Sequence, residues 1–267
     1  MPEAARDRLQ QAMALGEGLR RRYRAGTVRG TFVIELPTPR AVRALALAGF
    51  DFVVLDLEHS PVGVGELGPL IAEAQLCGVA ALVRPPALDA PLVGKLLDLG
   101  ANGVLIPHVD SAQEARTAVQ AARYAPEGTR GACPLTGTTV FDTPSGKLDS
   151  AALVLVQIES SQGLEAVDEI AATPGLDGVF VGPYDLSHAL GEPGEVDGEG
   201  VLEASRRIAL ATPERVMLGA YVDDPAQSQR WTERGFRFQC VGFDGRMLLA
   251  EARATLRIAC QAPEGVA

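Results

Sequence analysis

The stretch Leu155-Val156-Gln157-Ile158-Glu159-Ser160 is an apolar run, rich in β-branched residues, that leads into a carboxylate, and Val181-Gly182-Pro183-Tyr184-Asp185 repeats this pattern. Runs this short and this apolar predict buried parallel strands. Neighbouring parallel strands deliver the residues at their ends to one rim of a sheet, so Glu159 and Asp185 are expected to lie close together there. Two carboxylates in one cleft repel each other unless a cation, a proton or a basic side chain lies between them. Since hard divalent ions prefer oxygen ligands, the two stretches favour a metal site at the rim.

Short apolar runs of the same kind recur along the chain, with segments of helical spacing between most of them. The runs are 31–35, 52–56, 80–84, 103–106, 153–158, 178–181, 216–221 and 237–241. The helical segments are 39–48, 66–77, 92–99, 112–124, 163–172, 200–211 and 225–234. Such alternation over about 250 residues predicts an α/β fold of the (β/α)₈ TIM-barrel class, with a doubly wound open sheet as the second choice. Glycines end five of the helical segments, as left-handed helix ends require: Gly49, Gly78, Gly100, Gly175 and Gly235.

Length and composition predict one domain over residues 1–267. The 267 residues are 47% hydrophobic and can bury one large core, with a barrel at about 27–245, a surface helix before it and a C-terminal helix at about 246–260. Residues 125–150, rich in Gly, Thr, Pro and Ser, are long for a connection and are expected to form a functional loop.

The charge and the cysteines limit the classes of partner. A net charge of -10 opposes binding to nucleic acid or to an anionic membrane, so a small molecule is the expected partner. No stretch approaches the roughly 20 apolar residues that span a bilayer. The four cysteines lie far apart with no secretory leader before them, which favours a reducing cytoplasm.

Polar residues collect at the ends of the expected strands, where a barrel of this class forms its active face. They are Glu35, Asp56, Glu58, His59, Arg84, His108, Gln157, Glu159 and Asp185. His59 beside Asp56 and Glu58 suits general acid–base work, although a histidine that only caps the next segment is the alternative. His108 and His188 are weaker candidates, because a lone histidine after a proline or early in a helix is more often structural.

Arg84 follows an apolar run and precedes Pro85-Pro86, so its guanidinium is expected at the rim, where it could hold a carboxylate or enolate oxygen. An ion pair with Asp56 or Glu58 is the alternative, and both could hold at once. Glu159 and Asp185 would supply two oxygen ligands for Mg²⁺ or Mn²⁺, with water and substrate completing the shell. Neither Lys95 nor Lys147 is expected at a strand end, so carbonyl activation points to a metal rather than a Schiff base.

With these residues in view, the chain resembles the HpcH/HpaI family of metal-dependent pyruvate aldolases from about Gly30 to Asp244. The blocks that carry the resemblance are Gly49-Phe50-Asp51-Phe52, Asp56-Leu57-Glu58-His59, Leu82-Val83-Arg84, Gly128-Thr129-Arg130-Gly131, Gln157-Ile158-Glu159 and Gly182-Pro183-Tyr184-Asp185-Leu186-Ser187. Each block alone is weak evidence, whereas together they are specific.

The resemblance implies a pyruvate-type barrel and a role for each matching residue. Glu159 and Asp185 would hold a divalent metal (Mg²⁺, Mn²⁺ or Co²⁺), Arg84 would stabilise the pyruvate enolate, and His59, paired with Asp56, would move protons through water. Gln157 would contact pyruvate, and the backbone of Gly182, Pro183, Tyr184 and Asp185 would receive its carboxylate. Family members are commonly hexamers that exchange C-terminal helices, so residues 246–260 are expected on a neighbouring subunit.

The leading hypothesis is a class II aldolase that cleaves or forms a 4-hydroxy-2-oxo acid, giving pyruvate and an aldehyde. Residues 132–137, Ala-Cys-Pro-Leu-Thr-Gly, depart from the family pattern in a loop that helps to shape the mouth of the site. This departure keeps open oxaloacetate decarboxylation or another carbon–carbon bond formation at the same site. A CoA-ester lyase of the citrate-lyase type is a further alternative, although no basic cluster lies near the rim residues. A non-catalytic barrel is the alternative from another class.

Overall fold

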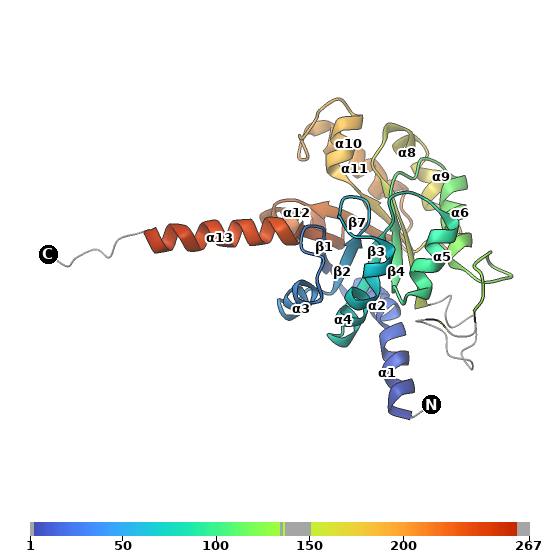
Figure 1. The fold of residues 1–267 in the computed structure, drawn as a ribbon. Helices are drawn as coiled ribbons and strands as arrows, with labels where there is room; N and C mark the ends of the chain where they lie inside the picture. Colours follow the sequence, from blue (N-terminus) through green and yellow to red (C-terminus); the bar gives the residue numbers. More distant parts are fainter. Residues whose placement is uncertain (1–2, 134–135, 137–150, 261–267) are drawn as a thin grey trace.

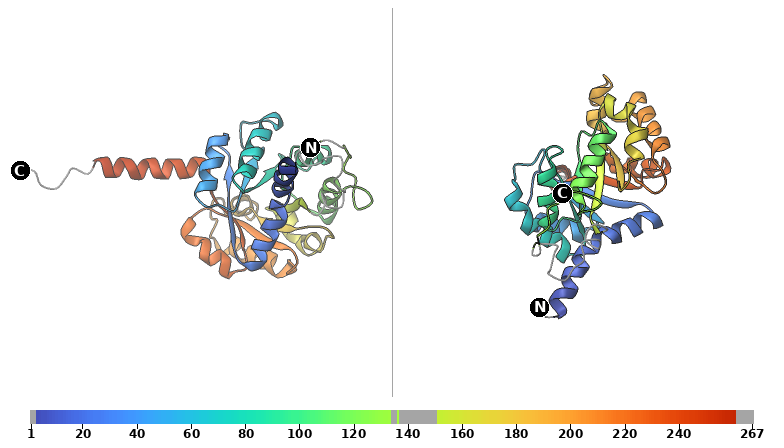
Figure 2. Two further views of the ribbon diagram at one scale, coloured as in Figure 1. Left: turned by 90° about the horizontal axis from the view of Figure 1, so that it is seen from below. Right: turned by 90° about the vertical axis from the view of Figure 1, so that its right-hand side faces the viewer.

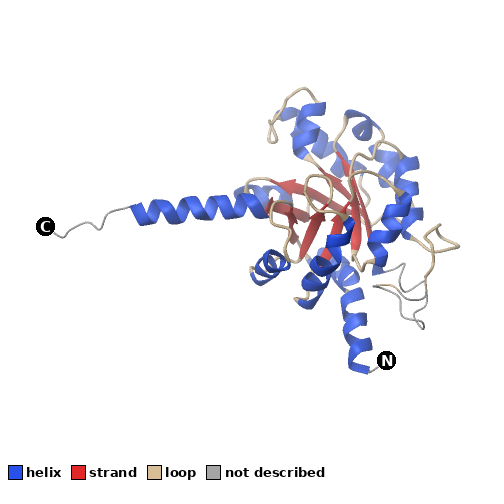
Figure 3. Cartoon of the chain, viewed as in Figure 1, coloured by secondary structure: helices blue, strands red, loops and turns tan. Residues whose placement is uncertain are grey.

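The structure, a computed structural model, describes residues 3–133, 136 and 151–260. Its sheet is a closed barrel of parallel strands in the order β1 to β8, surrounded by helices (Figures 1 and 3). The strands are β1 Val28–Val33, β2 Phe52–Asp56, β3 Ala80–Arg84, β4 Gly103–Ile106, β5 Leu153–Ile158, β6 Gly178–Val181, β7 Met217–Val222 and β8 Phe238–Phe243. The predicted TIM barrel is therefore confirmed, and the open sheet is excluded.

Helices follow the strands around the outside of the barrel. They are α1 Glu3–Met13, α2 Leu15–Ala25, α3 Pro39–Leu47, α4 Leu67–Leu76, α5 Ala90–Asp98, α6 Ala112–Ala122, α8 Ser161–Glu165, α9 Val167–Ala171, α10 Pro183–Ala189, α11 Glu199–Ala211, α12 Ser228–Glu233 and α13 Asp244–Cys260, with short 3₁₀ turns η1 Val64–Glu66 and η2 Pro225–Gln227. All five glycines expected at left-handed helix ends have positive φ, between 75° at Gly78 and 105° at Gly100, which confirms that prediction. Among the helices of the described ranges, none is long and apolar enough to cross a bilayer.

The alternation of side chains along each strand separates two apolar layers. On β2, Val53 and Leu55 belong to the layer between barrel and helices, whereas Phe52 and Val54 belong to a second buried cluster inside the barrel. Phe52 stacks on Phe238 of β8 in that interior, with ring centroids 4.3 Å apart. Because the period is two, the next inward position on β2 is Asp56, at the carboxyl end of the strand. The strand pattern that fills the barrel therefore also sets a polar side chain at its upper rim.

The same rule applies to β3 and β5. Leu82 belongs to the interior cluster and is followed two residues later by Arg84, and Leu155 is followed by Gln157 and Glu159. Asp56 and Arg84 are also register partners across β2 and β3. The polar groups at the rim are thus a continuation of the hydrophobic interior.

The last helix, α13, extends away from the barrel, as Figures 1 and 2 show. It begins at the buried Asp244, whose carboxylate accepts hydrogen bonds from the backbone N–H groups of Ile34, Glu35, Leu36 and Gly245 at 2.8–3.1 Å. These bonds join the end of β8 to the chain that leaves β1. Beyond this junction, Leu248, Leu249, Leu256 and Ile258 are exposed.

Candidate active site

Arg84 is held at the carboxyl end of the barrel by two carboxylates. Its Nε and Nη2 each donate a hydrogen bond of 2.8 Å to Asp56, one to each carboxylate oxygen, and its Nη1 lies 3.1 Å from Glu58 Oε2. Its guanidinium also lies over the ring of Phe32, 4.6 Å from the centroid. Burial opposes the charge of the guanidinium, but the hydrogen bonds and the charge of Asp56 outweigh burial and raise the pKa of Arg84. Arg84 is therefore a fixed cation with further N–H groups on Nη1 and Nη2 for a ligand.

Asp56 is 1% exposed and orients both Arg84 and the turn that follows β2. Its oxygens accept hydrogen bonds from the backbone N–H groups of Glu58 at 3.1 Å and His59 at 3.2 Å, besides the two from Arg84. The expected pairing of Asp56 with the His59 ring is absent from the contacts of the described residues. The ring instead has its Nε2 at 3.8 Å from Glu58 Oε2 and is largely exposed. The Asp56 carboxylate pairs with Arg84 and not with the His59 ring, because the register of β2 and β3 places Asp56 beside Arg84.

His108 joins the two sides of the site. Its Nε2 lies 2.9 Å from Glu58 Oε1 and its Nδ1 lies 3.0 Å from Glu159 Oε1, and its backbone N–H also donates to Glu159 Oε1 at 2.8 Å. Burial opposes the imidazolium charge, but Glu159 and Glu58 outweigh burial and raise the pKa of His108. With φ at 52°, it is the one non-glycine residue of the described ranges in the left-handed region.

His108 was expected to be a weaker candidate, because a histidine after a proline is more often structural, and the structure places it between Glu58 and Glu159. The available signal was the position of Pro107-His108 directly after a strand, at the same rim as Glu58 and Glu159. Those three residues are brought together in the structure.

Glu159 and Gln157 form the buried floor of the site. Both are nearly inaccessible, and Gln157 Nε2 donates a hydrogen bond to Glu159 Oε2. Burial raises the pKa of Glu159 to about 7, against the opposing hydrogen bond and charge of His108, and the charge of Asp185 adds to the rise. Gln157 Oε1 has no hydrogen-bond partner among the described residues. A buried carboxylate that resists ionisation, beside an unpaired carbonyl oxygen, is the donor set that a hard cation suits.

The chain passes close to this floor at Gly182, the residue before α10. A Cβ at this position would lie 2.6 Å from Glu159 Oε2 and 2.7 Å from Gln157 Nε2, so only glycine leaves the floor open. Pro183 occupies the first turn of α10, and Asp185 lies in the same turn with an exposed side chain. Tyr184 is also exposed and packs against His188, with ring centroids 5.0 Å apart.

No group of three His, Cys, Asp or Glu side chains in the described ranges is arranged to hold a metal alone. Lys95 lies on α5, outside the barrel, and Lys147 lies outside the described residues. Positions 134, 135 and 137 of the unusual 132–137 segment, and all of 137–150 in the expected functional loop, also lie outside them.

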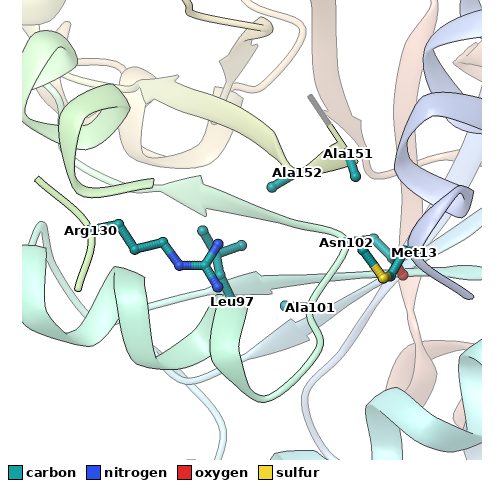
Figure 4. Close-up of a pocket in the computed structure, with 7 residues that line it drawn as sticks. All are labelled: Met13, Leu97, Ala101, Asn102, Arg130, Ala151 and Ala152. Atoms are coloured by element: carbon teal, nitrogen blue, oxygen red, sulfur yellow. The ribbon is translucent and has the colours of Figure 1, made fainter. Parts of the chain in front are cut away.

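Arg130, from the block Gly128 to Gly131, takes part in packing beside α5 rather than in the rim cluster. It donates to Asp98 at 2.6 Å and lies over the Tyr124 ring at 4.6 Å. Figure 4 shows it reaching toward Leu97 in a pocket that Met13, Ala101, Asn102, Ala151 and Ala152 complete. This cavity of about 20 Å³ has room for a single water molecule and none for a metabolite.

Comparisons with known proteins agree with the fold and with the family that the sequence motifs resemble. The family described as HpcH/HpaI aldolase/citrate lyase matches residues 30–250. The 5-keto-4-deoxy-D-glucarate aldolase of Shigella sonnei (strain Ss046) is 38% identical over 213 residues, which cover 78% of this chain and 83% of the relative. The resemblance stated from the sequence motifs and the expectation of a carbon–carbon lyase are confirmed by these matches.

Solved structures with the same fold also superpose on this chain. An HpcH/HpaI aldolase/citrate lyase family protein from Burkholderia cenocepacia J2315 superposes with a TM-score of 0.84 at 30% identity, covering 91% of this chain and 98% of that one. The citrate synthase SbnG superposes with a TM-score of 0.83 at 27% identity, covering 93% and 98%.

Proposed function

The chain belongs to the HpcH/HpaI aldolase/citrate lyase family, and from this premise we propose that it is a divalent-metal-dependent pyruvate aldolase. It would cleave or form a 4-hydroxy-2-oxo acid, with pyruvate and an aldehyde as the other partners. The observation that carries the proposal is the buried floor of Glu159 and Gln157 under Gly182, with the fixed Arg84 guanidinium at the same rim.

The metal site of the proposal consists of Glu159 and Asp185, with Mg²⁺, Mn²⁺ or Co²⁺ as the ion. Two features support a divalent cation at this position: the raised pKa of Glu159 and the unpaired Oε1 of Gln157. When bound, the cation would supply Lewis-acid polarisation of the substrate ketone.

Residues of the chain itself would bind the substrate, stabilise the developing charge and move the proton. Arg84 would stabilise the negative charge that develops on the pyruvate oxygen as the C3–C4 bond breaks, because its free N–H groups are fixed in advance by Asp56. Gln157 would contact pyruvate, and the backbone of Gly182 to Asp185 would receive the pyruvate carboxylate. His59 would move the hydroxyl proton at the exposed mouth of the site, with Glu58 rather than Asp56 as the carboxylate near its ring.

Pyruvate release from a panel of 4-hydroxy-2-oxo acids, measured with and without EDTA, tests the proposal. We expect cleavage that EDTA abolishes and that added Mg²⁺, Mn²⁺ or Co²⁺ restores. Cleavage that persists in EDTA would remove the metal from the mechanism, and failure to cleave any acid of the panel would remove the aldolase.

A second candidate function uses the same site and the same enolate for a different reaction. The similarity to the citrate synthase SbnG, at 27% identity over 93% of this chain, favours a reaction in which the same enolate attacks a partner other than an aldehyde, or forms by decarboxylation of oxaloacetate. Turnover of oxaloacetate with no turnover of simple aldehydes would support this candidate. The reverse result would eliminate it.

We also propose that α13 packs on a neighbouring subunit of a homo-oligomer, a hexamer by family resemblance. The exposed side chains of Leu248, Leu249, Leu256 and Ile258 support this, since a lone helix rarely keeps four large apolar residues in water. Light scattering after size-exclusion chromatography should give one assembly for the full chain and a smaller one for a chain that ends at residue 247. A monomeric full chain would refute the proposal.

A further inference from the structure

A second cleft lies at the opposite end of the barrel from Arg84 and Glu159. It is lined by α2, by the segment that leads into β7 and by the residues that lead into β8, and its volume is about 600 Å³. The left panel of Figure 2 looks from below, with α1 and α2 in dark blue. A cleft of this size is in the range of small-molecule sites. The proposed aldolase chemistry does not use it.

The lining of this cleft is basic, although the chain as a whole carries a net charge of -10. Four arginines face two acidic residues, Asp177 and Glu214. Asp177 is already neutralised, because Arg20 Nε donates to it at 2.8 Å and Arg123 Nη2 at 3.2 Å. The arginines that remain are Arg24, Arg215 and Arg237, and none of the three forms an ion pair within the part of the chain that the structure describes. We call these three residues and their surroundings the arginine cleft.

Arg237 is held in place without a carboxylate. Its guanidinium lies over the Tyr23 ring, 4.7 Å from the centroid, and the Tyr23 hydroxyl accepts a hydrogen bond of 2.9 Å from the backbone N–H of Leu218. Tyr23 is buried, so the platform under Arg237 is rigid. Stacking fixes the plane of the guanidinium and leaves its edge N–H groups available to a ligand. A group fixed in advance loses little conformational entropy on binding.

Arg215 approaches the same cleft from the loop before β7. One of its Nη2 N–H groups donates to the backbone carbonyl of Ala172 at 3.2 Å, and its side chain is otherwise exposed. Arg24 comes from the last turn of α2. Three guanidinium groups from three separate elements thus surround one hollow, with Glu214 as the remaining acidic side chain.

We propose that the arginine cleft binds a small oxyanion with at least two negative charges, in which phosphate or carboxylate groups lie against Arg215 and Arg237. The planar edge of a guanidinium matches both kinds of group through two parallel hydrogen bonds. Binding there would occur at the end of the barrel away from the active site, so it does not depend on the proposed reaction.

Isothermal titration of the full-length protein with pyrophosphate and, separately, with citrate tests this at low and constant ionic strength. We expect one saturable site for at least one of the two anions, and the anion that binds more tightly identifies phosphate or carboxylate as the preferred group. Arg215→Gln and Arg237→Gln should each weaken that site about tenfold or more, since each removes charge-assisted hydrogen bonds. Arg116→Gln, on the exposed face of α6, makes the same change in net charge and should alter the affinity less than about twofold.

Arg215 is exposed, so its replacement keeps the test valid even if Arg237→Gln fails to fold. Crystals soaked in tungstate should show an anomalous peak between Arg215 and Arg237. Absence of saturable binding by both anions would overturn the proposal. It would also fail if the Arg116 variant were weakened as much as the other two, or if neither cleft variant changed the affinity. Pyruvate release by the Arg215 variant should equal that of the unmodified chain, which separates this test from that of the aldolase.

Discussion

Asp56 and Arg84 are register partners on β2 and β3, and two hydrogen bonds of 2.8 Å join the carboxylate of one to the guanidinium of the other. The pair is buried, and it forms where two strands leave the apolar interior of the barrel. Its geometry is thus set by the sheet itself. The rim cation is therefore fixed by two neighbouring strands of the barrel.

Arg84→Ala should destabilise the protein strongly, because it leaves the Asp56 carboxylate buried without its cation. We expect a loss of about 3–5 kcal/mol in the free energy of unfolding, measured by urea titration. Arg43→Ala is the matched control, since its ion pair with Glu73 is exposed on the arginine side and its loss should lower the free energy of unfolding far less. Arg84→Lys keeps the charge and loses the two-bond geometry, so it should lower kcat about 100-fold or more. Normal pyruvate release by the lysine variant would contradict the assigned role.

Gly182→Ala should close the floor of the site while the barrel stays folded. The added Cβ would lie 2.6 Å from Glu159 Oε2 and 2.7 Å from Gln157 Nε2. We expect Mn²⁺ affinity, measured by titration calorimetry, to fall about tenfold or more. Gly65→Ala adds the same atom in η1, where nothing lies within 4 Å, and should leave the affinity unchanged. Equal Mn²⁺ affinity in the two variants would show that the floor is not the metal site.

The affinity of the metal-free protein for Mn²⁺ should depend on pH through Glu159. Burial raises the pKa of this carboxyl to about 7, so protons compete with the metal below that pH and not above it. We expect the affinity to fall up to about tenfold for each pH unit below 7 and to level off at higher pH. Glu159→Gln should bind weakly at every pH, without this dependence.

The same shift affects stability in the absence of metal. Because the pKa of Glu159 is raised in the folded state, this carboxyl ionises at a lower pH in the unfolded chain than in the folded protein. The protonated Glu159 therefore makes its full contribution to the free energy of unfolding at a pH below the ordinary pKa of a glutamate. It is lost as the pH rises toward about 7. Urea titrations of the unmodified chain and of Glu159→Gln should therefore converge at low pH and diverge as the pH rises. A difference in the free energy of unfolding that stayed constant with pH would contradict the raised pKa of Glu159.

Asp244→Ala should destabilise the junction of the barrel and α13. The Asp244 carboxylate accepts four backbone N–H groups at 2.8–3.1 Å, and these lose their acceptor in the variant. We expect a loss of about 3 kcal/mol in the free energy of unfolding. Asp224→Ala, which removes an exposed acceptor of a single N–H group, should cost about 1 kcal/mol or less. Similar losses in both variants would mean that the junction adds nothing beyond an ordinary cap.

The interior strands were predictable because both of their faces are buried. The bounds of β2 to β6 agree with the apolar runs, since in a parallel barrel the run and the strand coincide. The strand β1 was misplaced: it begins at Val28 and ends at Val33, whereas residues 31–35 were predicted. Arg29 is exposed and Gly30 makes room for the Phe52 ring, so neither residue looks like part of a buried strand in the sequence.

The helices and the site were less fully predictable for local reasons. Residues 163–172, predicted as one helix, form α8 and α9, which meet at Ala166. The helix α10 was missed because Gly182-Pro183 is typical of a turn, although proline is also favoured in a first helical turn. The rim residues followed from counting strand ends, and an ion pair of Arg84 with Asp56 or Glu58 was one of the alternatives. Which carboxylate receives two hydrogen bonds from Arg84 depends on the register of β2 and β3, and the contact of His108 with Glu58 depends on a left-handed backbone. Neither property can be read from residue order.

The alternation that sends Phe52, Val54 and Asp56 to one side of β2 has a consequence for how this protein could change in length. A one-residue insertion or deletion inside the strand would turn Asp56 outward, toward the helices, and bring Leu55 into its place. Libraries built to alter the aldehyde accepted by the enzyme should therefore vary the number of residues only in the connections above the rim. The number of residues in each strand should stay unchanged.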